Sequence, residues 1–120
     1  MPLITVDHTD RLAAAFDRRG FGLALNRLAA ELLDATPAKC KTRFRRTEEN
    51  VVGADADTFA LVAVKVEIFP GRSAEAKAAL AEAVLEALPE YLGPDAGPVQ
   101  VAVQVEELDH LAYRSTVLGV

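Results

Sequence analysis

The stretch FALVAVKVEIFPGRS, residues 59–73, contains the most apolar strand pattern of the sequence and its clearest helix start. Pro70-Gly71-Arg72 predicts a tight turn, and Ser73 is a favoured N-cap residue for a helix that follows it. The segment Phe59 to Phe69 therefore predicts a central strand that leads into a helix. One face of this strand would carry β-branched side chains at period two, namely Val62, Val64, Val66 and Ile68.

Beyond Ser73 the sequence continues as a helix and then as another strand. Valines at positions 99, 101, 103 and 105 alternate with polar or small residues, which is typical of a half-buried strand. The short apolar tail, residues 111–120, predicts a further strand paired at a sheet edge, in the same chain or on a neighbouring subunit. The helix that begins after Ser73 is expected to end near Leu92 and Gly93. Its apolar stripe consists of Leu80, Val84, Ala87 and Tyr91.

The residues before position 59 show the same order of strand, helix and strand. Leu3 to Asp7 predicts a short strand that begins almost at the first residue, and Gly20 to Ala35 predicts an amphipathic helix that stops before Pro37. Residues 11–19 fit either a helical turn or a loop. Cys40 to Thr47 predicts a strand with Cys40, Thr42 and Phe44 on one face and Lys41, Arg43 and Arg45 on the other.

Together these elements predict a single α+β domain over residues 1–120. Two βαβ halves of about 60 residues, each with a right-handed crossover, would place both helices on one face of one sheet. The other face would be bare. We expect that face to be largely apolar, which predicts oligomerisation through it or through the strand edges.

Composition excludes several classes of function. The net charge of −5 disfavours nucleic-acid binding, which relies on clustered positive charge. The single cysteine, Cys40, cannot form an intrachain disulfide, and its expected role is inert packing. No export signal and no apolar run of membrane-spanning length is evident, so we expect a cytoplasmic protein without a membrane or nucleic-acid partner.

The common cofactor and metal motifs are missing from the sequence. It has no glycine-rich phosphate loop, no paired-cysteine motif and no zinc-protease motif. His8 and His110 are too isolated in sequence to suggest a metal site by spacing, and we expect surface or loop positions for both. The function is therefore expected to need neither metal nor cofactor.

Pro2 is the remaining candidate for chemistry. If Met1 is removed, the Pro2 nitrogen becomes a secondary amine, which is both basic and nucleophilic. Apolar surroundings and nearby cations disfavour the protonated form of such an amine. Pro2 could therefore be neutral at working pH and act as a general base, whereas retention of Met1 would leave an amide without basicity.

Three short elements occur in an order that carries a resemblance. Met1-Pro2 precedes an apolar strand, Gly71-Arg72-Ser73 opens the second helix, and Val105-Glu106-Glu107-Leu108 lies near the end. Over nearly the whole chain the sequence resembles the 5-carboxymethyl-2-hydroxymuconate isomerase family of the tautomerase superfamily. The resemblance implies a homotrimeric isomerase of aromatic catabolism that acts on a muconate-type dicarboxylate, with an amino-terminal proline as base.

The resemblance also assigns roles to particular residues. Pro2 matches the base, and Arg72 matches the arginine of the turn before the second helix. Lys41 aligns with a family arginine, and Arg43 and Arg45 follow on the same strand face as further candidates for binding the substrate carboxylates. Lysine lacks the bidentate fork of arginine, so substrate orientation could differ. The alternatives are a tautomerase of another enol, such as a phenylpyruvate-like one, and a non-catalytic trimeric binding protein whose basic strand is only a solvated edge.

Overall fold

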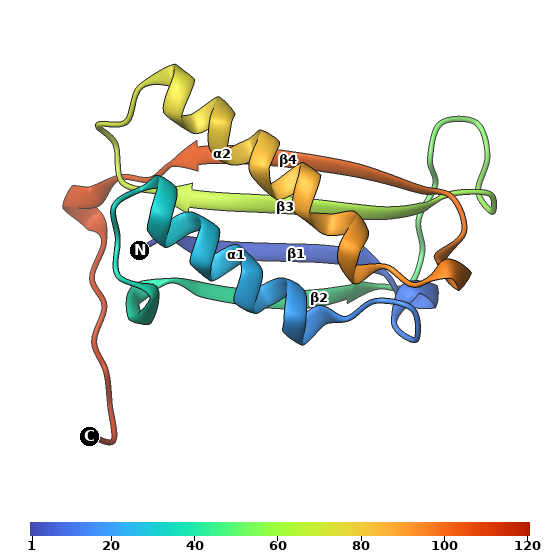
Figure 1. The fold of residues 1–120 in the computed structure, drawn as a ribbon, viewed down its shortest axis with the longest axis horizontal. Helices are drawn as coiled ribbons and strands as arrows, with labels where there is room; N and C mark the ends of the chain where they lie inside the picture. The colour runs from blue at the N-terminus through green and yellow to red at the C-terminus, as the bar shows by residue number, and fades with distance from the viewer.

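The computed structural model describes residues 1–120 and contains a four-stranded sheet with two helices across one face (Figure 1). This confirms the predicted α+β arrangement of two βαβ halves. The strands are β1 (Leu3–Thr9), β2 (Lys41–Thr47), β3 (Ala60–Ile68) and β4 (Val99–Glu107), and the helices are α1 (Arg18–Leu32) and α2 (Ala74–Ala87).

The strand order is β2-β1-β3-β4, so each half supplies one central strand and one edge strand. β1 pairs with β2 and β3 pairs with β4 in parallel, whereas the central strands β1 and β3 are antiparallel. The two halves are therefore related by an approximate two-fold axis between β1 and β3. Because Leu3 pairs with Glu67, the start of β1 lies at the same end of the sheet as the end of β3. This register brings Pro2 close to the turn that precedes α2.

The core lies between the sheet and the helices. The alternation predicted for the central strand is confirmed, because every second residue of β3 from Ala60 to Ile68 is buried. Burial of each large apolar side chain contributes about 1.5–3 kcal/mol to stability. The largest fully buried apolar side chains come from all layers and include Ile4, Leu12, Phe21, Leu25, Leu80 and Leu88.

Both helix starts are fixed by side-chain caps. Ser73 caps α2 as predicted, because its hydroxyl accepts a hydrogen bond from the Ala76 backbone N–H at 3.1 Å. Helix α1 begins at Arg18, two residues earlier than expected, and Gly20 lies inside it. The Asp17 carboxylate accepts a hydrogen bond from Gly20 N–H at 3.0 Å, and a Cβ on residue 20 would collide with that carboxylate. Gly20 therefore does not interrupt α1, because a residue without a Cβ leaves room for the capping carboxylate of Asp17.

The end of α2 differs from the prediction. The α-helix ends at Ala87, and the chain continues as a short 3₁₀ helix over Leu88–Tyr91. Pro89 lacks the N–H that an α-helix would use, which explains the early end. Neither α1 nor α2, nor any shorter helix, has the length and apolar character needed to cross a membrane.

His8 is not the surface or loop residue that the sequence suggested. β1 extends to Thr9, and His8 continues the buried face of Ile4 and Val6 with none of its surface exposed. Its ring meets the Phe16 ring edge-on, with centroids 5.6 Å apart, and its Nε2 has no hydrogen-bond partner. Burial lowers the pKa of His8.

The open face of the sheet is mostly polar, so the expectation of a largely apolar face was wrong. Lys41, Arg43 and Arg45 do share this face, as predicted, and they pair in register with Leu3, Thr5 and Asp7 of β1. The open face is polar because β2 and β4 alternate with period two, which places their charged and amide side chains on the side of the sheet without helices. The open-face residues of β3 and β4 are Leu61, Ala63, Lys65, Glu67, Gln100, Ala102, Gln104 and Glu106.

The tail does not form the predicted strand within the chain. After a short 3₁₀ helix over His110–Ala112, the backbone is irregular to the last residue. Figure 1 shows this tail running away from the end of β4, past β2 and beyond the body of the molecule. Three of its large apolar side chains are strongly exposed, at 75% for Leu111, 74% for Val117 and 86% for Leu118.

Candidate active site

Pro2 lies at the wall of a small pocket at one end of the sheet. It is buried, and its carbonyl accepts a hydrogen bond from the Lys41 backbone N–H at 3.2 Å. The amine of Met1 donates to the Lys39 carbonyl at 3.2 Å. The cavity, which we call the Pro2 pocket, has a volume of about 100 Å³ and is lined by Met1, Pro2, Leu33, Ala35, Ile68, Phe69, Pro70 and Arg72.

Arg72 is the cation of this pocket. The turn after β3 carries it, and its Nη2 donates a hydrogen bond to the carbonyl of Leu33, directly after α1. Arg72 forms no ion pair with a carboxylate of the chain, whose ion pairs are Arg45–Asp7, Arg46–Asp10 and Lys77–Glu107. The structure thus brings Pro2 and an unneutralised guanidinium together.

The three cations of β2 are placed differently from one another. Lys41 lies beside the chain start, whereas Arg43 donates through Nε to Thr5 Oγ1 at 3.3 Å. Arg45 binds Asp7 through two hydrogen bonds of 2.7 and 3.0 Å. At about 3.3 Å per strand residue, the register partners of Arg43 and Arg45 lie about 10 and about 17 Å along β1 from Pro2. Within one chain, only Lys41 of the three remains near Pro2.

The surroundings of the chain start favour an uncharged amine. Burial, followed by the charges of Lys41 and Lys39, lowers the pKa of the Met1 amine, and only Cys40 opposes this. Cys40 itself is buried, and burial raises the pKa of its thiol. A thiol with a raised pKa is a poor nucleophile, which is consistent with the predicted packing role of Cys40.

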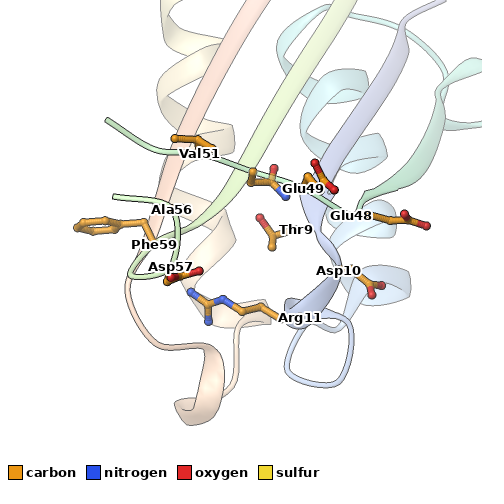
Figure 2. A pocket seen from close by; sticks show the side chains of 10 residues that line it. Thr9, Asp10, Arg11, Glu48, Glu49, Val51, Ala56, Asp57 and Phe59 are labelled. Carbon is orange, nitrogen blue, oxygen red and sulfur yellow. The ribbon is translucent and has the colours of Figure 1, made fainter. Parts of the chain in front are cut away.

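A larger cavity of about 510 Å³ lies at the opposite end of the sheet (Figure 2). In Figure 2 the Arg11 side chain extends toward the segment that carries Asp57. We call this cavity the acidic pocket, because Arg11 is its one cation and four of its lining residues are acidic. It is lined by Thr9, Asp10, Arg11, Glu48, Glu49, Asn50, Val51, Ala56, Asp57 and Phe59.

The acidic pocket is the counterpart of the Pro2 pocket in the other half of the chain. Arg11 follows β1 as Arg72 follows β3, and each guanidinium donates to a carbonyl in the segment after the other half's helix. Arg11 Nη1 donates to Ala96 O at 3.3 Å, and its Nη2 donates to Thr58 O at 3.2 Å.

The two pockets differ in chemistry. Pro2 directly precedes β1, and Phe59 directly precedes β3. Because Phe59 lies in the middle of the chain, its backbone nitrogen is an amide, and the acidic pocket has no terminal amine. Its four carboxylates would repel an anion, and no group of three His, Cys, Asp or Glu side chains converges as a metal site. Despite its smaller volume, the Pro2 pocket is therefore the better candidate for a carboxylate substrate.

Two residues of these pockets were missed in the sequence. Phe69 was treated only as the end of an apolar strand, although it directly precedes the turn that carries Arg72. Arg11 was treated only as part of the segment that follows the first strand; it lies two residues after the end of β1, whereas Arg72 lies four residues after the end of β3. Phe69 and Arg11 both lie within two positions of the end of a central strand, and that location was the signal available in the sequence.

Solved structures with the same fold include two 5-carboxymethyl-2-hydroxymuconate isomerases and a 4-OT trimer. A 5-carboxymethyl-2-hydroxymuconate isomerase from Deinococcus radiodurans R1 aligns at a TM-score of 0.80 and 18% identity, over 96% of this chain and 88% of that chain. A 5-carboxymethyl-2-hydroxymuconate delta-isomerase aligns at a TM-score of 0.79 and 11% identity, over 98% and 88% of the two chains. A fused 4-OT symmetric trimer aligns at 0.67 and 24% identity, over 88% and 85%.

No protein-family model and no curated protein matches the sequence. At these identities the structural likenesses establish the fold. The chain therefore has the tautomerase fold, and the resemblance found in its sequence is confirmed at that level.

Proposed function

We propose that the chain is a cofactor-independent isomerase that shifts a proton along a conjugated, muconate-type dicarboxylate, with Pro2 as the general base once Met1 is removed. The observation that carries this proposal is the shared pocket of Pro2 and Arg72. Two solved proteins of the same fold are named as isomerases of 5-carboxymethyl-2-hydroxymuconate, which supports this substrate class.

The reaction needs one group that both removes and returns a proton. The neutral Pro2 amine would take a proton from the enol hydroxyl or from a carbon next to the carbonyl, which leaves a delocalised anion. The protonated amine would then return the proton to a carbon further along the conjugated chain. Substrate and product are isomers, so no oxidant or reductant is consumed. Such general acid–base catalysis contributes about 10²- to 10⁴-fold in rate.

The charges around Pro2 suit both parts of this reaction. Burial and the charge of Lys41 lower the pKa of the Met1 amine, and the same surroundings would favour a neutral amine at Pro2 once Met1 is removed. The unpaired guanidinium of Arg72 can bind a substrate carboxylate or stabilise the developing anion. Lys41 would add a point charge without a bidentate fork. Arg43 and Arg45 lie further along the sheet than Lys41, and both remain candidates for binding a substrate carboxylate, in this subunit or in a neighbouring copy.

We also propose that the working form is a homotrimer. The tail exposes Leu111, Val117 and Leu118, and it extends beyond the body of the molecule (Figure 1). Packing of these side chains on a neighbouring subunit would remove them from water. Two solved structures of the same fold are described as symmetric trimers, which supports this number of subunits.

The decisive experiment compares two forms of the protein, one beginning at Pro2 and one that retains Met1, each verified by intact mass. On a 2-hydroxymuconate-type substrate, only the form beginning at Pro2 should isomerise the substrate, because only it has a secondary amine. Pro2→Ala in the processed form should lower kcat/KM by about 10²- to 10⁴-fold. Equal activity of the Met1-retaining form would refute Pro2 as the base.

A second candidate reaction keeps the base and changes the substrate. The wall of the Pro2 pocket includes the Phe69 ring, which would also suit an aryl enol such as that of phenylpyruvate. The ratio of kcat/KM for the dicarboxylate and the aryl enol, measured on the same preparation, decides between the two. Loss of activity toward both would favour the non-catalytic binding protein.

A further inference from the structure

Three aromatic side chains gather at the rim of the Pro2 pocket. Phe69 lines the pocket and is 40% exposed, so its ring faces both the cavity and solvent. The Tyr113 ring meets it edge-on, with centroids 5.3 Å apart and an interplanar angle of 79°. The His110 ring lies 6.4 Å from it at 73°. Edge-to-face pairs at such distances are favourable beyond the area that they bury.

The backbone that carries Tyr113 is held in place without help from Phe69. Leu108 N–H donates to the Ile68 carbonyl at 2.9 Å, which extends the contact between β3 and β4 past the last strand residue. The Asp109 carboxylate then accepts from Leu111 N–H at 3.1 Å and caps the short helix His110–Ala112. These hydrogen bonds hold the backbone that places Tyr113 next to the Phe69 ring.

We propose that Tyr113 positions the Phe69 ring at the mouth of the Pro2 pocket, and that this ring selects substrates with a flat, conjugated carbon chain next to a carboxylate. This inference rests on the proposed function and specifies its substrate preference. Tyr113 is a positioning residue, because it acts through Phe69.

The lining of the pocket supports a role for Phe69 at its mouth. Met1 forms one wall of the cavity, so its removal would open space beside Pro2. Phe69 lines the same cavity and is 40% exposed, so a carbon chain that extends from Pro2 toward solvent would pass along its ring. A flat conjugated chain can lie against the ring with its whole face, and a saturated, puckered chain cannot.

Loss of Tyr113 should weaken binding more than proton transfer. Without its edge-to-face partner, the Phe69 ring can leave the mouth of the pocket, and the substrate must then order it on binding. We expect Tyr113→Ala to raise KM by about 2- to 12-fold, the range that corresponds to one aromatic pair, with kcat changed by less than about two-fold.

Two inhibitors of equal length and charge separate selection by the ring from simple loss of structure. Muconate is flat and conjugated, whereas adipate is saturated, and calorimetry gives the dissociation constant of each. The wild type should prefer muconate. Tyr113→Ala should bring the two constants closer together, and Tyr113→Phe, which keeps the ring and loses the hydroxyl, should retain the wild-type ratio.

Each outcome of this experiment bears on the inference. If Tyr113→Ala keeps the wild-type preference for muconate, the inference about Tyr113 is overturned and the proposed function is unaffected. Failure of the wild type to bind either dicarboxylate refutes the dicarboxylate pocket and the inference with it. If Tyr113→Ala does not fold, Phe69→Leu replaces it, because leucine keeps apolar bulk without a ring and should narrow the ratio in the same way.

Discussion

Replacement of Arg72 by alanine should abolish most of the catalytic efficiency, whereas the same replacement at Arg11 should not. Each arginine follows a central strand of the sheet, and each donates to a carbonyl beyond the opposite helix. Arg11→Ala therefore removes a comparable structural contact at the other end of the sheet. It leaves the Pro2 pocket untouched.

The expected size of the effect follows from the two contributions of Arg72. A single hydrogen bond to a carbonyl contributes about 0.5–1.5 kcal/mol to stability, and both variants lose at least one. Electrostatic stabilisation of a developing anion contributes about 2–4 kcal/mol, and only Arg72→Ala loses it. That range corresponds to a fall in kcat/KM of about 30- to 1000-fold. Arg11 has two carbonyl partners, so its loss should destabilise the fold at least as much.

The assay is steady-state isomerisation of a 2-hydroxymuconate-type substrate by the processed protein, combined with urea unfolding of each variant. The two variants should lose similar amounts of stability and very different amounts of activity. Equal kcat/KM for Arg72→Ala and Arg11→Ala would show that Arg72 is only a structural tie, whatever the role of Pro2.

Three further predictions concern charge, burial and assembly. Lys41→Gln removes a positive charge that lowers the pKa of the terminal amine, so the acid limb of the pH profile of kcat/KM should move to higher pH, and an unmoved limb would exclude Lys41 from the site. Burial lowers the pKa of His8, so below about pH 6.5 the unfolded state binds the extra proton and the free energy of unfolding should fall by up to about 1.4 kcal/mol per pH unit. Urea unfolding from pH 8 to 5 should show this slope in the wild type and a smaller one in His8→Leu. Deletion of residues 114–120 should dissociate the trimer in sedimentation experiments at micromolar concentration, and an intact trimer would contradict the proposed role of the tail.

The strands and helices were predictable because local signals and packing agree along most of the chain. The alternation in residues 59–69 and the cap at Ser73 needed no tertiary information, since period two and side-chain capping act over a few residues. Local patterns did not predict the structure at positions where contacts with residues distant in the sequence determine the conformation. Gly20 belongs inside α1 because of the Asp17 cap, and the polar residue His8 continues a buried face because Phe16 and Phe44 surround it.

The candidate site was predictable only in part, for a similar reason. The position of Pro2 and the turn that holds Arg72 could be identified from residues close together in the sequence. Their meeting depends on the antiparallel register of β1 and β3, a long-range property that no local pattern specifies. The same applies to Phe69 and Tyr113, which are 44 positions apart and meet only because β4 ends beside β3.

The internal two-fold explains why the smaller pocket is the better candidate for catalysis. The fold makes two pockets of similar origin, each with an arginine tied to a carbonyl beyond the opposite helix. A proline nitrogen can be a base only at the first residue of a chain, because every internal proline nitrogen is an amide. The pocket at the start of β3 can therefore never carry the base that we propose for Pro2. Nothing then requires that end of the sheet to attract anions, which is consistent with its four carboxylates around Arg11.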